Sequence, residues 1–150
     1  MDDSIRHLDK RFAALQPLKD AKRPPKGWIR AIRDALGMTS AQFARRMNIV
    51  QSSASELEQS EARDGITLKR LERAAEALGC RVVYALVPER PLAETMRDRA
   101  ERVAERQLAA VEHTMRLENQ AVSDKGAHTE LRRRTIDDLL RNPSRLWDEE

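Results

Sequence analysis

The spacing of apolar residues along the chain predicts a mostly helical protein. Residues 5–15 carry apolar side chains every three or four positions along one face, and residues 28–36 repeat this pattern. Between residues 39 and 60 the same spacing predicts two short helices joined by a tight turn. Asn48 stands at that turn, and asparagine tolerates left-handed backbone better than most residues. Residues 67–79 predict another helix, which begins at a threonine cap and ends at a glycine.

The pattern changes after residue 80. Residues 81–88, RVVYALVP, are rich in β-forming side chains and predict one short strand. No second strand is recognisable, and a lone strand leaves its backbone groups unpaired, so we expect two chains to pair this segment across a two-fold axis. The alternative is a strand that packs alone over the helices. The residues expected to pair are Val82, Val83, Tyr84, Ala85, Leu86 and Val87.

Two more helices are predicted in the last third of the chain. A long helix opens at Pro91 and runs to about Val122, residues 123–127 interrupt it, and residues 129–141 form the last helix. Trp147 in the charged tail is expected to be a packing anchor.

These patterns divide the chain into four parts. We expect an N-terminal helix and basic linker at 1–27, a DNA-binding domain at 28–80, a dimerisation strand at 81–90, and a C-terminal helical region at 91–150. The expected fold class is therefore mostly α, with one short strand and a C-terminal helical extension.

Composition and charge narrow the classes of function. The chain has 150 residues, of which 35% are charged and 3% are aromatic, and its mean hydropathy is −0.70. Residues 1–37 hold 9 basic and 5 acidic groups, whereas residues 89–150 hold 12 basic and 14 acidic groups. Of these two segments, only the N-terminal one has the excess of positive charge that attracts a polyanion such as DNA. No apolar run reaches the length of a membrane span. A cytoplasmic, bacterial and nucleoid-associated protein is expected, and the single Cys80 is expected to be buried.

Residues 39–60, TSAQFARRMNIVQSSASELEQS, carry the clearest functional pattern. One face of the second predicted helix is apolar, while its start is small and polar, which suits entry into the DNA major groove. Residues 28–78 resemble the XRE family, the phage-repressor type of helix-turn-helix protein. The entry MTSAQFA and the register VQSSASELE carry this resemblance.

The resemblance implies which side chains meet DNA. The expected base contacts are Gln51, Ser52, Ser55 and Glu56, and the expected phosphate contacts are Lys26, Ser40, Ser53, Arg63 and Lys69. Glutamine can make a bidentate contact with adenine. Two alternatives stay open: Ser53 and Ser55 reach either phosphates or bases, and Glu56 either accepts a hydrogen bond from cytosine or repels phosphate.

The long C-terminal helix carries a second pattern. Val111, Met115 and Val122 fall on one helical stripe, and Glu118 lies on the same stripe, where a plain packing helix would place an apolar residue. Residues 114–119, TMRLEN, match [Ser/Thr]-x-x-x-Glu-[Gly/Asn], which is similar to the inhibitory helix of Fic-domain adenylyltransferases. By that likeness Glu118 would pair with an arginine of the Fic active site, and Thr114 and Asn119 would fix the helix in the groove.

The chain as a whole resembles the mobile mystery protein A family, XRE regulators whose genes lie beside a Fic-domain partner. Residues 20–39, 60–80 and 84–92 carry this resemblance. It implies an antitoxin that represses its own operon as a homodimer, with operator DNA and a Fic-domain toxin as partners. The alternatives are a plain phage-type repressor with a helical dimerisation tail, and an interaction scaffold that no longer reads DNA.

Patterns typical of enzymes are missing from the sequence. His7, His113 and His128 are scattered, no Cys/His cluster has metal-ligand spacing, and the five glycines form no phosphate loop. We therefore expect no enzymatic activity, no catalytic residue, no cofactor, no metal and no small-molecule substrate. No membrane partner is expected either.

Overall fold

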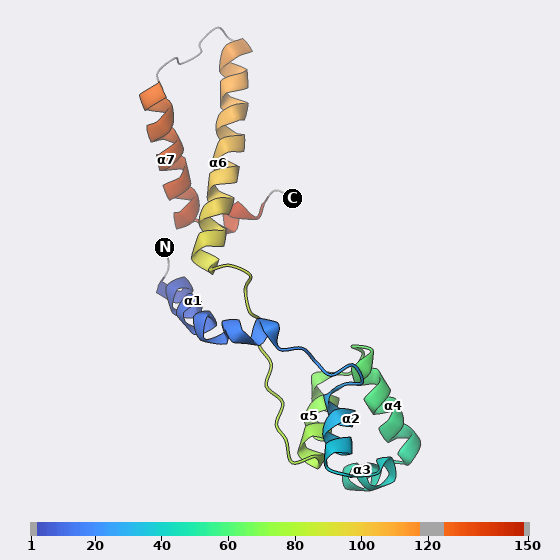
Figure 1. The fold of residues 1–150 in the computed structure, drawn as a ribbon. Coiled ribbons are helices and arrows are strands. Elements are labelled where there is room, and N and C mark those ends of the chain that lie inside the picture. Colours follow the sequence, from blue (N-terminus) through green and yellow to red (C-terminus); the bar gives the residue numbers. More distant parts are fainter. Residues whose placement is uncertain (1–2, 118–124, 149–150) are drawn as a thin grey trace. The chain divides into compact units, whose positions relative to one another are not determined.

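The computed structural model describes residues 3–117 and 125–148, which fall into two compact units (Figure 1). One unit comprises residues 18–86. The other joins the residues up to 17 with those from 87 onward, so the N-terminal helix packs with the C-terminal helices. No helix in the described ranges is both long and apolar enough to cross a membrane.

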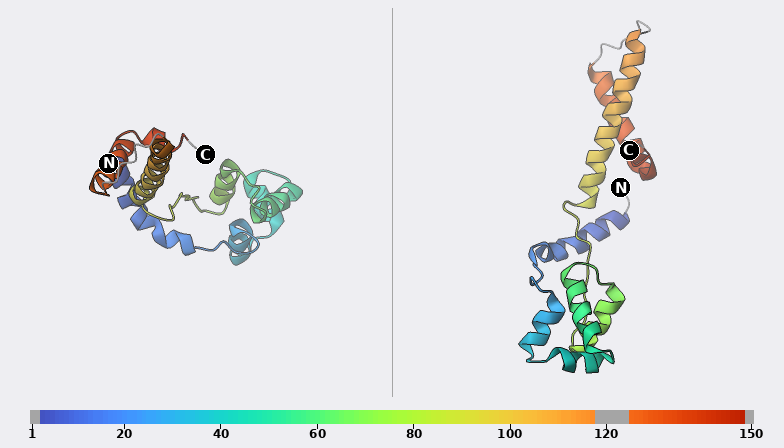
Figure 2. Two further views of the ribbon diagram at one scale, coloured as in Figure 1. Left: turned by 90° about the horizontal axis from the view of Figure 1, so that it is seen from above. Right: turned by 90° about the vertical axis from the view of Figure 1, so that its right-hand side faces the viewer.

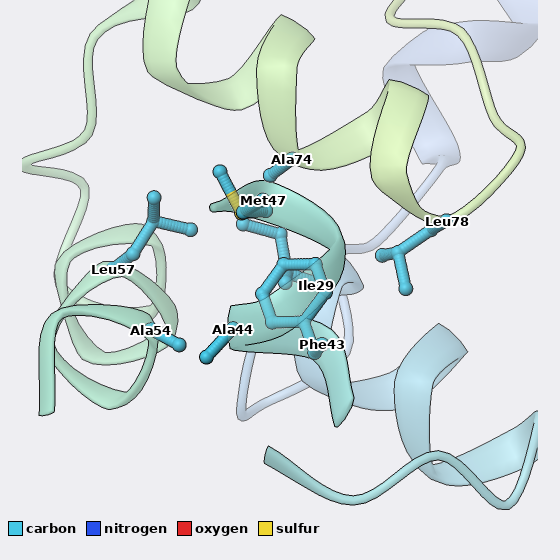
Figure 3. Close-up of a cluster of buried hydrophobic side chains, with 8 residues drawn as sticks. All are labelled: Ile29, Phe43, Ala44, Met47, Ala54, Leu57, Ala74 and Leu78. Carbon is cyan, nitrogen blue, oxygen red and sulfur yellow. The ribbon is translucent and has the colours of Figure 1, made fainter. Parts of the chain in front are cut away.

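The unit of residues 18–86 is a bundle of short helices around one core. Its helices are α2 (Trp28–Ala35), α3 (Ser40–Met47), α4 (Gln51–Ala62) and α5 (Leu68–Ala77). Phe43 is completely buried, and side chains from all four helices surround it (Figure 3). The core residues are Ile29, Phe43, Ala44, Met47, Ala54, Leu57, Ala74 and Leu78. Small alanines let the helices approach closely around one large aromatic ring.

Local capping residues set helix ends in this unit, and the sequence predicts those at Asn48 and Thr67. The hydroxyls of Thr39 and Thr67 accept hydrogen bonds from the backbone N–H groups of Gln42 and Arg70. Asn48 adopts left-handed backbone with φ 57° and ends α3. These caps confirm the predicted helix-turn-helix and the helix that follows it.

The predicted strand is absent from the described part of the chain. Residues 81–88 are extended but form no ladder, because a strand needs a partner and none lies beside this segment within one chain. The expected burial of Cys80 is also wrong: its side chain is exposed. It follows Gly79, whose positive φ turns the chain away from the end of α5.

The second unit contains α1 (Asp3–Leu15), α6 (Leu92–Leu117), α7 (Lys125–Arg141) and the 3₁₀ turn Pro143–Leu146. Another 3₁₀ turn, Gln16–Asp20, spans the boundary between the two units. α6 and α7 lie side by side as a helical hairpin (Figures 1 and 2). α7 begins at Lys125, within the interruption predicted for residues 123–127. The helix therefore incorporates Gly126 and Ala127, since a single glycine weakens a helix without preventing it.

The hairpin has its core at one end. Ala100, Val103 and Ala104 of α6 pack with Leu139 of α7 and with Leu146. Leu146 is the buried anchor of the tail, whereas Trp147 is half exposed and is covered on one face by the Arg99 guanidinium, 5.5 Å from the ring centroid.

Asp9 of α1 caps the start of α6. Its two carboxylate oxygens accept hydrogen bonds from the backbone N–H groups of Leu92 and Ala93, at 2.7 and 3.0 Å. A carboxylate at a helix N-terminus also interacts favourably with the helix dipole. This contact ties the N-terminal helix to the hairpin across more than 80 residues of sequence.

Candidate nucleic-acid interface

α4 presents two different faces. Ala54, Leu57, Glu58 and Glu61 are buried against the rest of the unit. Gln51, Ser52 and Glu56, three of the four predicted base-contact residues, are exposed. The start of α4 is thus held by its inner face and offers polar side chains to the outside, as insertion into a major groove requires.

Ser55, the fourth predicted base contact, is half-buried and lies beside α3. Its Oγ is 3.4 Å from the Oγ of Ser40, one of the predicted phosphate contacts. The structure therefore brings these two residues together where the start of α3 lies against α4. Ser53 is also half-buried, on the first turn of α4.

A concave surface of about 400 Å³ opens beside this serine pair. Lys26 and Arg30 supply cationic groups to its lining, and Ser40, Ser55 and Gln59 supply hydrogen-bonding groups. The Arg33–Glu58 ion pair lines it as well, and there the arginine offsets the charge of the carboxylate. A phosphate needs this combination of positive charge and donors. Arg30 is not among the sequence-predicted contacts, and its spacing from Lys26 gave no signal, because Lys26 precedes α2 and Gly27 between them has positive φ.

The other two predicted phosphate contacts lie elsewhere on the unit. Arg63 is the C-cap of α4, at the opposite end of the helix from Gln51, and its Nε donates to the carbonyl of Gln59 at 3.3 Å. Twelve helical residues span about 18 Å. Lys69 is exposed in the first turn of α5. Lys26 lies toward the same end of α4 as Arg63, because Gln59 and Ala62 line its concavity and Gly27 lies against Glu61. The start of α4 itself carries Gln51 and Ser52, and the Ser40–Ser55 pair lies one turn further along the helix.

Buried acidic residues of α4 hold the neighbouring helices in place. Glu61 accepts hydrogen bonds from the backbone N–H groups of Trp28 and Ile29, at 2.8 and 2.9 Å, and so caps α2. Gly27 makes this cap possible: it has φ +85°, and a Cβ there would lie 2.6 Å from the Glu61 carboxylate oxygen. α2 has no side-chain cap of its own, so its start depends on α4.

Arg33 of α2 and Glu58 of α4 form a buried ion pair with two hydrogen bonds. The hydrogen bonds with Glu58 raise the pKa of the Arg33 guanidinium above its ordinary value. Arg33 also donates to the carbonyl of Met38 at 2.8 Å, just before α3. One side chain thus connects α2, the entry to α3, and α4, and this connection fixes the direction in which α4 projects.

Sequence reasoning missed Glu58 and Glu61 as structural residues. The signal was present, because Ala54, Leu57, Glu58 and Glu61 are spaced by three, one and three residues, which places them on one helical face. A carboxylate on an apolar face indicates a partner on another helix. Arg23 extends the same arrangement by donating to the carbonyls of Glu61 and Ala62 at the end of α4.

The predicted toxin contacts that the structure describes, Val111, Thr114 and Met115, lie in the last two turns of α6. Thr114 is exposed, and its hydroxyl donates to the carbonyl of Ala110 at 3.0 Å. Val111 and Met115 line a groove of about 490 Å³ between α6 and α7, opposite Leu131. Glu118, Asn119 and Val122 lie outside the described residues. The two described apolar residues therefore face α7 and are only partly covered by it.

The predicted dimer strand is the most exposed apolar segment in the unit of residues 18–86. Val83, Tyr84 and Leu86 are 77%, 71% and 86% exposed. Ala85 is also exposed, whereas Val82 and Val87 are half-buried. Within a single chain, the side chains of Val83, Tyr84 and Leu86 are therefore mostly exposed to solvent.

Comparison with known families agrees with this geometry. Residues 29–84 match the family model described as Helix-turn-helix, HTH_3, which is the XRE type. The match runs from α2 through α5 and reaches the extended segment. No curated protein and no solved structure matched the chain. Residues 29–84 are thus an XRE-type helix-turn-helix, and they support a DNA-binding regulator of transcription.

Proposed function

We propose that this protein binds a specific operator as a homodimer and represses transcription from it. The observation that carries the proposal is the start of α4, where Gln51, Ser52 and Glu56 are exposed while the inner face of the same helix is fixed by the core and by two buried carboxylates. Gln51 and Ser52 read base edges, and the Lys26–Arg30 concavity holds a phosphate.

Selection of DNA by the full-length protein from a random duplex library tests this proposal. We expect enrichment of a pseudo-palindromic site whose half-sites lie about one helical turn, roughly 34 Å, or a multiple of it apart, because each chain supplies one reading helix. Enrichment of a single asymmetric half-site would contradict the dimeric arrangement. A pool without any enriched sequence would contradict operator binding and favour the scaffold function.

The homodimer is proposed to form by pairing of residues 82–87 from two copies. Their exposed apolar side chains and unpaired extended backbone support this arrangement. Val83→Pro removes a backbone donor and should convert the dimer to monomer in sedimentation, lowering operator affinity without touching a DNA contact. Glu72→Ala, at an exposed position on α5, serves as a control for general effects. A Val83→Pro protein that stays dimeric would place the dimer contact on a helix.

A second candidate function is neutralisation of a Fic-domain toxin by the end of α6 and the residues after it. The resemblance of residues 114–119 to the Fic inhibitory helix motivates it. The accessibility of Thr114 and Leu117 at the last turn of α6 supports it, since a partner can reach both. In this proposal Glu118 pairs with a buried arginine of the toxin, Thr114 and Asn119 position the helix, and Val111, Met115 and Val122 supply apolar contacts.

Co-expression with the product of the neighbouring gene, which this proposal requires to be a Fic-domain protein, tests this second function. Glu118→Gly should leave operator affinity unchanged yet release adenylylation and stop growth, because the toxin arginine becomes free to orient ATP. His113→Gly, at an exposed position of the same helix outside the lining of the groove, is the matched control for lost helix propensity. If Glu118→Gly protects cells as well as the wild-type protein does, the antitoxin function fails. A plain repressor with a helical dimerisation tail is then the better description.

A further inference from the structure

The residue that precedes α4 lacks the hydroxyl cap that the helices on either side of α4 have. α3 and α5 begin after Thr39 and Thr67, whose hydroxyls cap them. α4 begins after Val50, which has the same extended backbone, φ −77° and ψ 153°, but offers no side-chain cap. Threonine would therefore fit the backbone at Val50 and supply the missing hydrogen bond.

Burial does not explain this valine. Val50 is 66% exposed, which makes it the most exposed large apolar residue between residues 28 and 79. Its neighbour Ile49 supplies the apolar contact with the core at this turn. The sequence thus gives up a helix cap and exposes two methyl groups at one position, and neither choice stabilises the folded chain.

The position of Val50 indicates what these methyl groups contact. Val50 directly precedes Gln51 and Ser52, the two exposed polar residues at the start of the reading helix. In the major groove the only apolar group on a base edge is the C5 methyl of thymine. We propose that Val50 is a specificity-determining residue that packs its methyl groups against a thymine methyl in each half-site. This inference rests on the proposed operator binding.

The contact accounts for the lost cap. A serine or threonine hydroxyl that accepts from the α4 backbone would turn a polar atom toward the groove, whereas valine presents only carbon. Removing one buried methyl contact lowers affinity about fourfold. Val50 therefore adds an A·T preference beside the hydrogen bonds made by Gln51.

Replacement of single thymines by deoxyuridine in the selected operator tests this inference, because it deletes only the C5 methyl. For the wild-type protein we expect one thymine per half-site whose replacement lowers affinity about fourfold. Val50→Ser should bind the thymine and deoxyuridine sites equally, while its Tm rises by about 4 °C from the restored cap. Val50→Thr restores the cap and keeps one methyl, so its thymine preference should be intermediate.

Each other outcome overturns the inference. A wild-type protein that is insensitive to deoxyuridine at every position, or a thymine preference that survives Val50→Ser, excludes a methyl contact by Val50. Weaker binding of Val50→Ser to all sequences together with a smaller sedimentation coefficient would assign Val50 to a contact between chains. If selection enriches no sequence at all, operator binding itself fails, which is distinguishable from the loss of this one contact.

Discussion

The helix-turn-helix unit and the α6–α7 hairpin hold their charged side chains in different ways. In the first, Arg33, Glu58 and Glu61 are buried and their hydrogen bonds run between helices. In the second, the pairs between α6 and α7, Arg132 with Glu105 and His128 with Glu112, lie on the surface, as do the pairs of Glu130 with Arg133 and Arg134 within α7. A buried hydrogen bond between charged groups is screened less by water than an exposed one and is costlier to break. We therefore expect the buried bonds to hold the helices of the first unit more firmly than the surface pairs hold the hairpin.

The two regions also differ in how evenly they are packed. Phe43 and its neighbours form one core shared by all four helices of the first unit. The hairpin is packed at the end that contains Leu139 and Leu146, while the groove at Val111 and Met115 is open. A scaffold for base reading needs a fixed surface, and a half-open hairpin is suited to contacts that form with a partner.

The largest expected effect tests the cross-helix ion pair. Glu58→Ala should lower the free energy of unfolding by about 3–4 kcal/mol, because it leaves the buried Arg33 guanidinium without its main partner. Glu72→Ala, at an exposed position of α5, should change it by less than about 0.5 kcal/mol. Urea unfolding followed by circular dichroism measures both. Equal losses for the two variants would contradict the stabilising role of the buried Arg33–Glu58 pair.

The next effect tests the uneven packing of the hairpin. Leu139→Ala at the packed end should lower the free energy of unfolding by about 3 kcal/mol, since it leaves a cavity in a closed core. Leu131→Ala at the groove should lower it by about 1 kcal/mol or less, because the side chain is half exposed. If the two losses in the free energy of unfolding, measured with denaturant, differ by at least twofold, the hairpin is packed unevenly as described. Similar losses would show that the groove is closed in solution.

A smaller effect tests the long-range cap on α2. Gly27→Ala and Gly37→Ala both place a side chain at positive φ, which costs about 1 kcal/mol each. Only at Gly27 does the new Cβ also meet the Glu61 carboxylate, so that variant should lose about 2 kcal/mol in total. Thermal unfolding compares the pair directly. If Gly27→Ala is no worse than Gly37→Ala, the carboxylate of Glu61 moves freely and does not fix α2.

The smallest expected effect concerns the surface pairs of α7. Hydrogen bonds from Arg133 and Arg134 lower the pKa of Glu130 to about 2. Because the folded-state pKa lies below the ordinary one, the pairing contributes above about pH 4 and is lost as the pH falls toward 2. NMR titration of the carboxyl carbon in the full chain should show this low value. Replacing both arginines by glutamine should return it to the ordinary range, and a titration unchanged by that replacement would contradict the pairing.

The sequence predicts features that depend on neighbouring residues. Asn48, Thr67 and Gly79 mark helix ends correctly because each acts on backbone within a few residues of itself. The exposed start of α4 follows from the same local reasoning and from the helical period.

Features that depend on distant partners could not be predicted in the same way. Asp9 caps α6 from more than 80 residues away, and nothing around Asp9 in the sequence identifies that helix. The β-forming character of residues 81–88 is a local property, whereas a strand exists only with a neighbour. Glu58 and Glu61 could be predicted in part. The helical period places them on the inner face of α4, but it does not identify Arg33 and the start of α2 as their partners.

The specificity ratio of operator binding tests the central claim most directly. It is the affinity of the full-length protein for its selected site divided by that for a scrambled duplex, measured at several salt concentrations. We expect a ratio of about 10³ or more for the wild-type protein. For the double variant Gln51→Ala, Ser52→Ala, we expect a ratio lower by about 10- to 100-fold and an unchanged salt dependence, because phosphate contacts remain. A wild-type protein without sequence preference, or a double variant that keeps the full ratio, would contradict base reading by the start of α4.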